Sequence, residues 1–210
     1  ETKGGAGWID ENTLLVAADF GKGTTTTSGY PRLVKIWERG TSLKDVEPVY
    51  TADSTITGVF PVTFYSHGRN YSAIYVGLST FHSELHLLTE TGFRKLTFPQ
   101  DARFAGLFRN QVILSLQSDW EREEGLFNAG SLVSFDLDDN LRDEFTVTTI
   151  FEPDKRSSFE SMSSCKDFIV VNSMQNVQNS LSIYRLNQGR WEEETLDTPD
   201  FGSIYMVSAD

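Results

Sequence analysis

Two stretches of the sequence have residue types and spacings that could bind a ligand or a metal ion. Residues 19–32 are rich in glycine and contain one lysine, but they lack the two glycines five residues apart that lead into the lysine of a phosphate-binding loop. Residues 136–140 alternate oxygen-bearing side chains like the start of a calcium loop, but Leu141 replaces its glycine and Val147 its bidentate glutamate. We therefore predict a long connecting loop at the first stretch and a hairpin turn at the second.

Side chains that could act as acid, base or nucleophile form no recognisable catalytic motif. The acidic runs 123–124 and 192–194 are typical of a solvated surface on a chain of net charge −12. Cys165 stands alone, so it can form neither an intrachain disulfide nor a multi-cysteine zinc site, and we expect a small buried residue. The Gly-x-Ser-x-Gly turn that carries the nucleophile of many serine hydrolases is absent from the sequence. We predict no catalytic residue, no metal ligands and no cofactor in this chain.

The balance of charge narrows the classes of partner. The chain has 18 Lys and Arg against 30 Asp and Glu, without a basic cluster that could release counterions from a nucleic acid or attach to an anionic membrane surface. No stretch approaches the about 20 apolar residues of a membrane span. We therefore expect neither a nucleic acid nor a membrane as partner. The single cysteine favours a cytoplasmic over a periplasmic location.

The elements that must position these side chains form an internal repeat. Four aspartates that close similar segments, Asp53, Asp101, Asp154 and Asp200, follow one another at intervals of about 50 residues. Each interval contains a short strand with small residues, a more apolar strand, and a hairpin in which apolar and polar residues alternate. Because apolar residues recur at every second position, we predict four antiparallel strands in each repeat and no long helix.

This repeat predicts an all-β fold, the β-propeller. Four-stranded units of about 50 residues have the size of propeller blades, and glycine and alanine in the first strand suit the crowded position near a propeller axis. The chain, 1–210, is then a single propeller region of four blades plus the first strand of a fifth. The boundaries fall near residues 1–53, 54–101, 102–154, 155–200 and 201–210.

The loops between the second and third strands of the blades are the best candidates for recognition. They comprise residues 19–30, 80–83, 119–129 and 174–179, and two of them are far longer than a hairpin requires. Because long loops on a rigid scaffold tend to carry binding residues, we predict contacts with a substrate or partner there, with simple coverage of the blades as the alternative. The candidate contact residues are Tyr30, Arg32, His82, Trp120 and Arg122.

A stretch near the start of the chain is similar to a known family. Residues 8–16 (WIDENTLLV), 19–21 (DFG), 27–37 (TSGYPRLVKIW) and 39–41 (RGT) resemble the propeller region of bacterial prolyl oligopeptidase-like serine peptidases. The resemblance implies a two-domain peptidase, in which a seven-bladed propeller covers an α/β-hydrolase domain with a Ser-Asp-His triad. It also implies that the propeller admits short peptides and excludes folded proteins. None of the triad's motif positions lies in this chain, so no catalytic residue is transferred to it.

We therefore expect the chain to be the non-catalytic, substrate-gating propeller portion of such a peptidase, with the hydrolase domain of the same parent chain and short peptides as partners. A stand-alone propeller that binds a protein or peptide is the first alternative, although the missing closing blade and the lack of a Trp-Asp signature weigh against it. A propeller enzyme with its own metal site, such as a lactonase, is the second. It would need carboxylates and histidines at the ends of inner strands, where Asp10, His67, Asp167 and Asp210 are expected.

Overall fold

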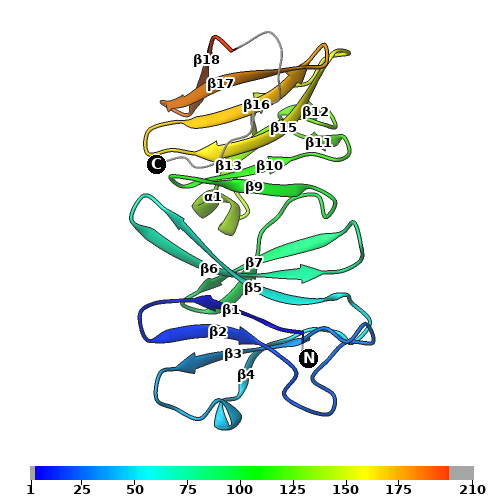
Figure 1. The fold of residues 1–210 in the computed structure, drawn as a ribbon, viewed down its shortest axis with the longest axis vertical. Helices are drawn as coiled ribbons and strands as arrows, with labels where there is room; N and C mark the ends of the chain where they lie inside the picture. Colours follow the sequence, from blue (N-terminus) through cyan, green and yellow to red (C-terminus); the bar gives the residue numbers. More distant parts are fainter. Residues whose placement is uncertain (1–2, 199–210) are drawn as a thin grey trace. The chain divides into compact units, whose positions relative to one another are not determined.

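The computed structural model describes residues 3–198, which are built almost entirely from antiparallel β-strands (Figure 1). These strands form four four-stranded sheets and one two-stranded hairpin. The chain divides into two compact units, unit 1 (Glu1–Gln100) and unit 2 (Asp101–Asp210), each with two of the four-stranded sheets. The sheets have the size and strand order of propeller blades, so the predicted all-β propeller fold is confirmed. The predicted strand of a fifth blade, 201–210, lies outside the described residues.

Unit 1 contains the first and second blades, in which the strands follow one another in chain order. A 3₁₀ turn (Leu43–Asp45) precedes the last strand of the first blade. The first blade consists of β1 (Gly5–Trp8), β2 (Thr13–Ala17), β3 (Leu33–Glu38) and β4 (Pro48–Thr51), and the second of β5 (Gly58–Ser66), β6 (Arg69–Gly77), β7 (Ser83–Thr89) and β8 (Gly92–Lys95).

The first and second blades bury one hydrophobic cluster between them. Leu15 and Ala17 of β2 and Ile74 and Val76 of β6 are almost completely buried in it. They occupy every second position of their strands, because successive side chains of a strand point to opposite faces of the sheet. Burying a side chain of the size of leucine contributes about 1.5–3 kcal/mol to stability. These side chains, which point to one face of each sheet, therefore hold the two blades of unit 1 face to face.

Unit 2 contains the third and fourth blades, and the third carries two insertions. A hairpin of β11 (Trp120–Arg122) and β12 (Gly125–Phe127) follows its second strand, and helix α1 (Leu137–Leu141) follows its third. The third blade consists of β9 (Arg103–Phe108), β10 (Gln111–Ser115), β13 (Leu132–Asp136) and β14 (Thr148–Phe151), and the fourth of β15 (Ser157–Ser164), β16 (Ile169–Gln175), β17 (Gln178–Asn187) and β18 (Arg190–Thr195).

The third and fourth blades share a second hydrophobic cluster. Phe108 of β9, Ile113 of β10 and Ile169 of β16 are fully buried in it. The ring of Trp191 packs against that of Phe108 with 5.6 Å between the ring centroids, and its Nε1 donates a hydrogen bond to the hydroxyl of Ser134 at 2.8 Å. Because Ser134 is completely buried, this hydrogen bond joins the outer strand of the fourth blade to the interior of the third.

Small residues let the inner strands of neighbouring blades approach closely. A Cβ atom at Gly7 of β1 would lie 2.8 Å from the hydroxyl oxygen of Thr63 in β5, and that hydroxyl donates to Trp8 O at 2.8 Å. The same device occurs in unit 2, where the Ser164 hydroxyl of β15 donates to Leu107 O of β9 at 3.0 Å. The crowding predicted for the glycines of the first strand is thus observed in unit 1.

One predicted turn is instead a short helix. The sequence predicts a hairpin turn at 136–140, whereas residues Leu137–Leu141 form α1, which the carboxylate of Asp136 caps by accepting hydrogen bonds from Asp138 N and Asp139 N at 3.0 and 3.1 Å. Asp and Asn favour tight turns and helix starts for the same reason, because their short side chains bond to nearby backbone N–H groups. The prediction of a turn was wrong because this preference does not separate the two outcomes.

Two of the predicted loops also differ from expectation. Residues 174–179 are not a loop, because β16 and β17 continue through them and join in a two-residue turn at Asn176 and Val177, both with positive φ. Within 119–129, the predicted loop contains the hairpin of β11 and β12. Cys165 is half-buried rather than buried. The part of the chain that the structure describes has no helix with the length and apolar character needed to cross a membrane.

Candidate functional site

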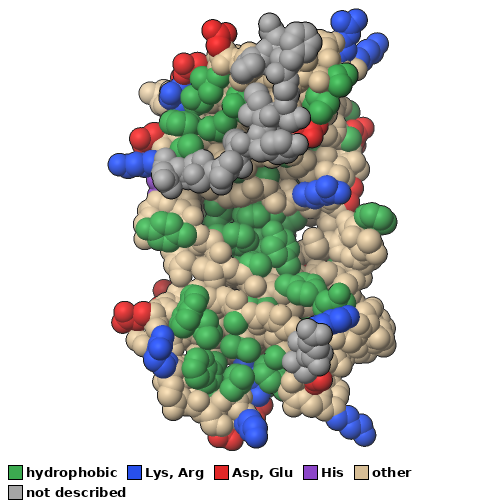
Figure 2. Space-filling model, in the orientation of Figure 1, with side chains coloured by type: hydrophobic (Ala, Val, Ile, Leu, Met, Phe, Trp, Pro, Cys, Tyr) green, Lys and Arg blue, Asp and Glu red, His purple; other side chains and the backbone are tan. Residues whose placement is uncertain are grey.

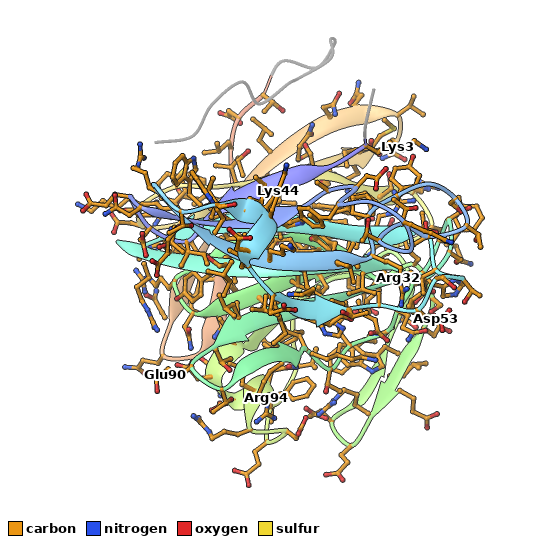
Figure 3. All side chains as sticks on the ribbon, turned by 90° about the horizontal axis from the view of Figure 1, so that it is seen from below. Lys3, Arg32, Lys44, Asp53, Glu90 and Arg94 are labelled. Carbon is orange, nitrogen blue, oxygen red and sulfur yellow. The ribbon has the colours of Figure 1, made fainter. Side chains whose placement is uncertain are left out.

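The loop end of a unit, defined as the end at which the second strand of a blade passes to the third, is where the sequence places its candidate contact residues. Figure 3 shows Lys3, Arg32 and Asp53 at this end of unit 1, whereas Glu90 in the turn between β7 and β8 lies toward the opposite end. The loop 18–32 connects β2 to β3 here. Tyr30 and Arg32 belong to its last residues, so their placement depends on how this loop folds.

Loop 18–32 is held by hydrogen bonds within itself and to the link between the two blades. Asp19 Oδ1 accepts from Gly21 N at 2.9 Å and from the Thr24 hydroxyl at 3.2 Å. The Thr26 hydroxyl donates to Thr57 O at 3.1 Å. Gly21 has a φ of 117°, in the region that favours glycine. The predicted long loop is therefore an ordered part of the scaffold, as a surface that positions a ligand must be.

Arg32 fastens this loop to the end of β4. Its Nε donates to Ala52 O at 2.7 Å and its Nη1 to Gly23 O at 3.2 Å. Hydrogen bonds from the hydroxyl and the backbone N–H of Thr55, with a further contribution from the charge of Arg32, lower the pKa of Asp53. Arg32 thus has a structural role, and its contact with a substrate or partner stays a prediction.

Tyr30 closes the gap between loop 18–32 and the second blade. A Cβ atom at Gly58 would lie 2.6 Å from Tyr30 Cβ, so only glycine leaves room for this side chain. The Tyr30 ring meets Phe60 edge-on with 5.6 Å between centroids, and Lys3 Nζ lies 3.8 Å from its centroid. The face of an aromatic ring attracts a cation electrostatically, so this contact between Lys3 and Tyr30 is favourable. Tyr30 is half-buried, so part of its ring is accessible at the loop end of unit 1.

His82 lies in the short connection between β6 and β7 at the same end. Its Nδ1 is 3.0 Å from the Ser79 hydroxyl, and its carbonyl oxygen accepts from Leu78 N at 2.9 Å. The neighbouring Phe81 ring is 75% exposed. The structure thus brings Tyr30, Arg32 and His82 to one end of unit 1, as the sequence predicts.

Trp120 and Arg122 lie in the inserted hairpin of unit 2 and pack against the segment before β14. The Arg122 guanidinium lies 4.1 Å from the ring centroid of Phe145 and donates through Nη2 to Phe145 O at 2.8 Å. Arg122 Nε is 3.4 Å from Glu124 Oε2, and the other oxygen of this carboxylate accepts from Val147 N at 3.0 Å. These contacts hold the hairpin to the blade, and binding by Trp120 or Arg122 stays a prediction.

A cavity of about 520 Å³ opens between the inner strands of the third and fourth blades. Both inner strands contain a β-bulge there, because the register of β9 against β10 shifts at Ala105 and that of β15 against β16 shifts at Glu160. The sequence does not reveal this site, since β9 (RFAGLF) and β15 (SSFESMSS) have no regular alternation of apolar and polar residues in which an extra residue would be visible. The residues that line it include Arg103, Ser115, Gln117, Ser158, Glu160 and Met162.

A half-buried carboxylate in the second blade is also absent from the predicted set. Glu84 accepts hydrogen bonds from Lys95 Nζ at 2.6 Å and Gln100 Nε2 at 2.8 Å, and its Oε2 lies 2.9 Å from His86 Nε2. Burial raises the pKa of Glu84, but the hydrogen bonds from Lys95 and His86 outweigh it and hold the pKa below its ordinary value. The ring of Tyr50 packs edge-on against His86. Through Tyr50 of β4, which also packs edge-on against Phe93 of β8, the cluster links the outer strands of the two blades.

The residues considered for a metal site do not assemble in the described chain. Among residues 3–198, no three His, Cys, Asp or Glu side chains gather in a group that could hold a metal ion. Asp10 instead accepts from Asn12 N at 2.8 Å, and Asp210 lies outside the described range. On the face seen in Figure 2, acidic and basic side chains are scattered among apolar ones. This face, in its described part, therefore presents no large patch of one charge.

Comparisons with known proteins agree with the resemblance found at residues 8–41. No known family model matches the chain. The chain is 27% identical to an uncharacterized peptidase of Sinorhizobium fredii over 219 residues, which cover all of this chain and 30% of that protein. Among solved structures, it resembles a post-proline cleaving enzyme from Rickettsia typhi with a TM-score of 0.84, 23% identity, and coverage of 94% of this chain and 30% of the enzyme. Prolyl oligopeptidase B from Galerina marginata gives a TM-score of 0.64 at 15% identity, over 100% of this chain and 29% of that one.

These comparisons confirm the resemblance to prolyl oligopeptidase-like peptidases and its restriction to their propeller portion. The solved structures share the fold, and the curated relative shares enough sequence to align along the whole chain. The chain spans about 30% of the length of the curated relatives it matches.

Proposed function

We propose that the chain is the non-catalytic propeller portion of a serine peptidase of the prolyl oligopeptidase type, and that it filters substrates for a hydrolase domain located elsewhere in the parent protein. The observation that carries the proposal is the whole-length alignment of this chain to only 30% of a peptidase. The sequence has no Gly-x-Ser-x-Gly turn, which agrees with a portion that does not itself cleave peptides.

Filtering requires that neighbouring blades stay together, and the contacts between inner strands support this part of the proposal. Gly7 allows β1 and β5 to approach until the Thr63 hydroxyl reaches Trp8 O. Ser164 and Leu107 form the corresponding hydrogen bond in unit 2. Because these contacts lie on strands rather than loops, separating the blades of a unit would also expose its hydrophobic cluster. A folded protein would therefore be excluded, whereas a short peptide could enter without deforming the blades.

The substrates in this proposal are short peptides that contain proline. The relative from Rickettsia typhi is described as a post-proline cleaving enzyme, and we extend that preference to the parent of this chain. The loop-end residues Tyr30 and His82 would contact the peptide, while the missing domain would supply the nucleophile, the base and the oxyanion site. Holding the peptide near that domain raises the rate by orientation rather than by chemistry in this chain.

The test compares substrate sizes with the full-length protein that contains these residues. A proline-containing octapeptide and a folded protein with the same proline sequence in an exposed loop are incubated with it, and cleavage is followed by mass spectrometry. We expect the octapeptide to be cleaved after proline and the folded protein to be spared. Equal cleavage of the folded protein and the octapeptide would remove the filtering role. No cleavage of any peptide, together with a reading frame that lacks a hydrolase domain, would favour a binding platform.

A further inference from the structure

The cavity between β9 and β15 in unit 2 has the properties of a built ligand site. Its volume of about 520 Å³ lies within the about 300–1,000 Å³ that pockets for small ligands occupy. Its walls come from strands, from the residues that follow β10 and from Pro153 before β15. Side chains on strands are held more precisely than side chains on loops, so this cavity can present polar groups in a fixed arrangement.

Two β-bulges border the cavity. Phe104 pairs with Leu114 and Gly106 with Ile113, which leaves Ala105 as the extra residue of β9. In β15, Glu160 is the extra residue between Phe159 and Ser161. A bulge bends its strand and turns a side chain away from the alternating pattern, and bulges are frequent beside active sites. Both bulges border the same cavity, which points to a site rather than to two unrelated irregularities.

Arg103 provides a cation on one wall of the cavity. It pairs with Ser115 in the register of β9 and β10, on the face of the sheet where Ile113 and Gly106 turn toward the fourth blade. Its side chain is exposed, and no acceptor within residues 3–198 hydrogen-bonds to its guanidinium. A guanidinium has five N–H donors in a planar fork that fits the two oxygens of a carboxylate.

Glu160 of β15 provides an anion in the lining of the same cavity. Its Oε1 accepts a hydrogen bond from the Ser158 hydroxyl at 2.9 Å, and no cation among the described residues forms an ion pair with it. The two charges of the cavity are therefore both open to a ligand. A ligand with one negative group and several N–H donors suits this pair, whereas a doubly charged phosphate would be repelled by Glu160 and by the net charge of −12.

We propose that this cavity is a subsite for the carboxyl-terminal end of a short peptide, with Arg103 binding the α-carboxylate and Glu160 accepting hydrogen bonds from the peptide's N–H groups. The apolar side chains of Phe159 and Met162, which pack against the core of unit 2, would contact the peptide's own side chains. This inference rests on the proposed function, because it takes peptides as the ligands. It adds a preference that the proposed function does not contain, namely for peptides with a free carboxylate.

The test measures binding separately from cleavage. Titration calorimetry with the full-length protein uses the tripeptide Ala-Ala-Ala and its carboxyl-terminal amide as probes. We expect the free acid to bind about tenfold or more tightly than the amide, because hydrogen bonds to charged groups are the stronger ones. Arg103→Gln should remove this difference, and Arg103→Lys should keep part of it. Arg94→Gln is the matched control, since Arg94 is an exposed arginine on β8 in unit 1.

Each outcome decides a separate question. Equal binding of acid and amide to the unchanged protein, or an unchanged preference in Arg103→Gln, would overturn the subsite while the substrate-size test of the proposed function stands. Tighter binding of inorganic phosphate than of the tripeptide would overturn the assignment to a carboxylate. A preference for the acid that depends on Arg103, in a protein that cleaves no peptide, would support the subsite and contradict the peptidase proposal. Thermal unfolding of Arg103→Gln checks that the exposed substitution leaves the fold intact.

Discussion

The inner strands of the two units pack in different ways. In unit 1, β1 pairs with β2 and β5 with β6 without a register shift, and Gly7 brings β1 against Thr63 of β5. In unit 2, β9 and β15 each contain a bulge, and a cavity lies between them. The same blade plan therefore gives a closed contact in one unit and a cavity in the other. The two extra residues, Ala105 and Glu160, both line the cavity, where a bulge turns side chains out of the alternating pattern.

The largest expected effect is a loss of unfolding free energy, and it tests whether the hydrophobic cluster of unit 2 is as well packed as that of unit 1. Phe108→Ala should lower the free energy of unfolding by about 3–5 kcal/mol, because it removes a fully buried ring and leaves a void. Leu15→Ala is the matched change in unit 1 and should cost about 2–5 kcal/mol. Chemical denaturation of both variants measures the two values. A loss below about 1 kcal/mol for Phe108→Ala would mean that the core of unit 2 rearranges freely.

The next largest effect on stability is expected from alanine substitutions of two glycines, Gly7 in β1 and Gly106 in β9, at which a Cβ atom would make a close contact. Gly7→Ala should destabilise by about 1–3 kcal/mol, because the added Cβ would lie 2.8 Å from a Thr63 hydroxyl that is held by its hydrogen bond to Trp8 O. Gly106→Ala should also destabilise, but through its backbone, because its φ of 159° is one that residues with a side chain rarely adopt, whereas the atom 2.8 Å away is the terminal methyl of Met162, which can rotate.

Gly5→Ala serves as the control for both changes, because its Cβ would meet only Pro61 Cδ, at an ordinary distance of 3.7 Å. Melting temperatures of the three variants give the order directly. An equal loss for Gly7→Ala and Gly5→Ala would contradict the tight contact in unit 1.

A smaller loss of stability is expected from removing the hydrogen bond of a tryptophan side chain, and it should depend on whether the acceptor is buried or exposed. Trp191→Phe keeps most of the ring but leaves the fully buried Ser134 hydroxyl without this donor, which should cost about 1–2 kcal/mol. Trp37→Phe in unit 1 removes a hydrogen bond to Thr41 O at an exposed site, where water can replace the donor, so we expect about 0.5 kcal/mol or less. Urea denaturation compares the two, and the reverse order would be inconsistent with the packing of Trp191.

The smallest expected effect is on the pH dependence of stability, and it compares the carboxylates of Glu84 and Glu160. The pKa of Glu84 lies below its ordinary value of 4.5, so its contribution to stability is complete above about pH 4.5 and is lost as the pH falls through its lowered pKa. Glu84→Gln should therefore make stability less dependent on pH below pH 4.5 than in the unchanged protein. Glu160→Gln is the control, because its carboxylate is exposed in the cavity wall. Unfolding curves between pH 3 and 6 that coincide for Glu84→Gln and the parent would contradict this role of Glu84.

Much of the fold follows from residue alternation. The apolar residues of β7 and β17 recur at every second position, whereas β2, β6, β10 and β16 have continuous apolar runs, and all of these strands form where the sequence predicts them. Alternation of apolar and polar residues shows which side chains of a strand face a neighbouring sheet. Because it involves only residues close together in the chain, it can be detected in a single sequence. The same reasoning found the long loop 18–32 with Tyr30 and Arg32, because glycine and threonine runs interrupt the alternation.

Elements with ambiguous local signals were predicted less well. Asp136 begins a helix where a hairpin turn was expected, because both conformations use the same hydrogen bonds from the aspartate. Asn176 and Val177 form a two-residue turn although valine rarely adopts a positive φ, so the sequence favoured a longer loop. At the second of these sites, the pairing of β16 with β17 continues up to Gln175 and Gln178 and leaves only two residues for the turn.

The sequence by itself determined the strands, the blades and the resemblance to a peptidase propeller, because these depend on the order of apolar, polar and glycine residues along the chain. Only the tertiary structure decided the roles of single side chains. It directs Arg32 to the backbone of β4 and Arg122 to Phe145, and it leaves Arg103 and Glu160 open in a cavity. The physical reason is that partners of a charged side chain come from strands far apart in sequence, and a bulge of one residue changes which of them it can reach.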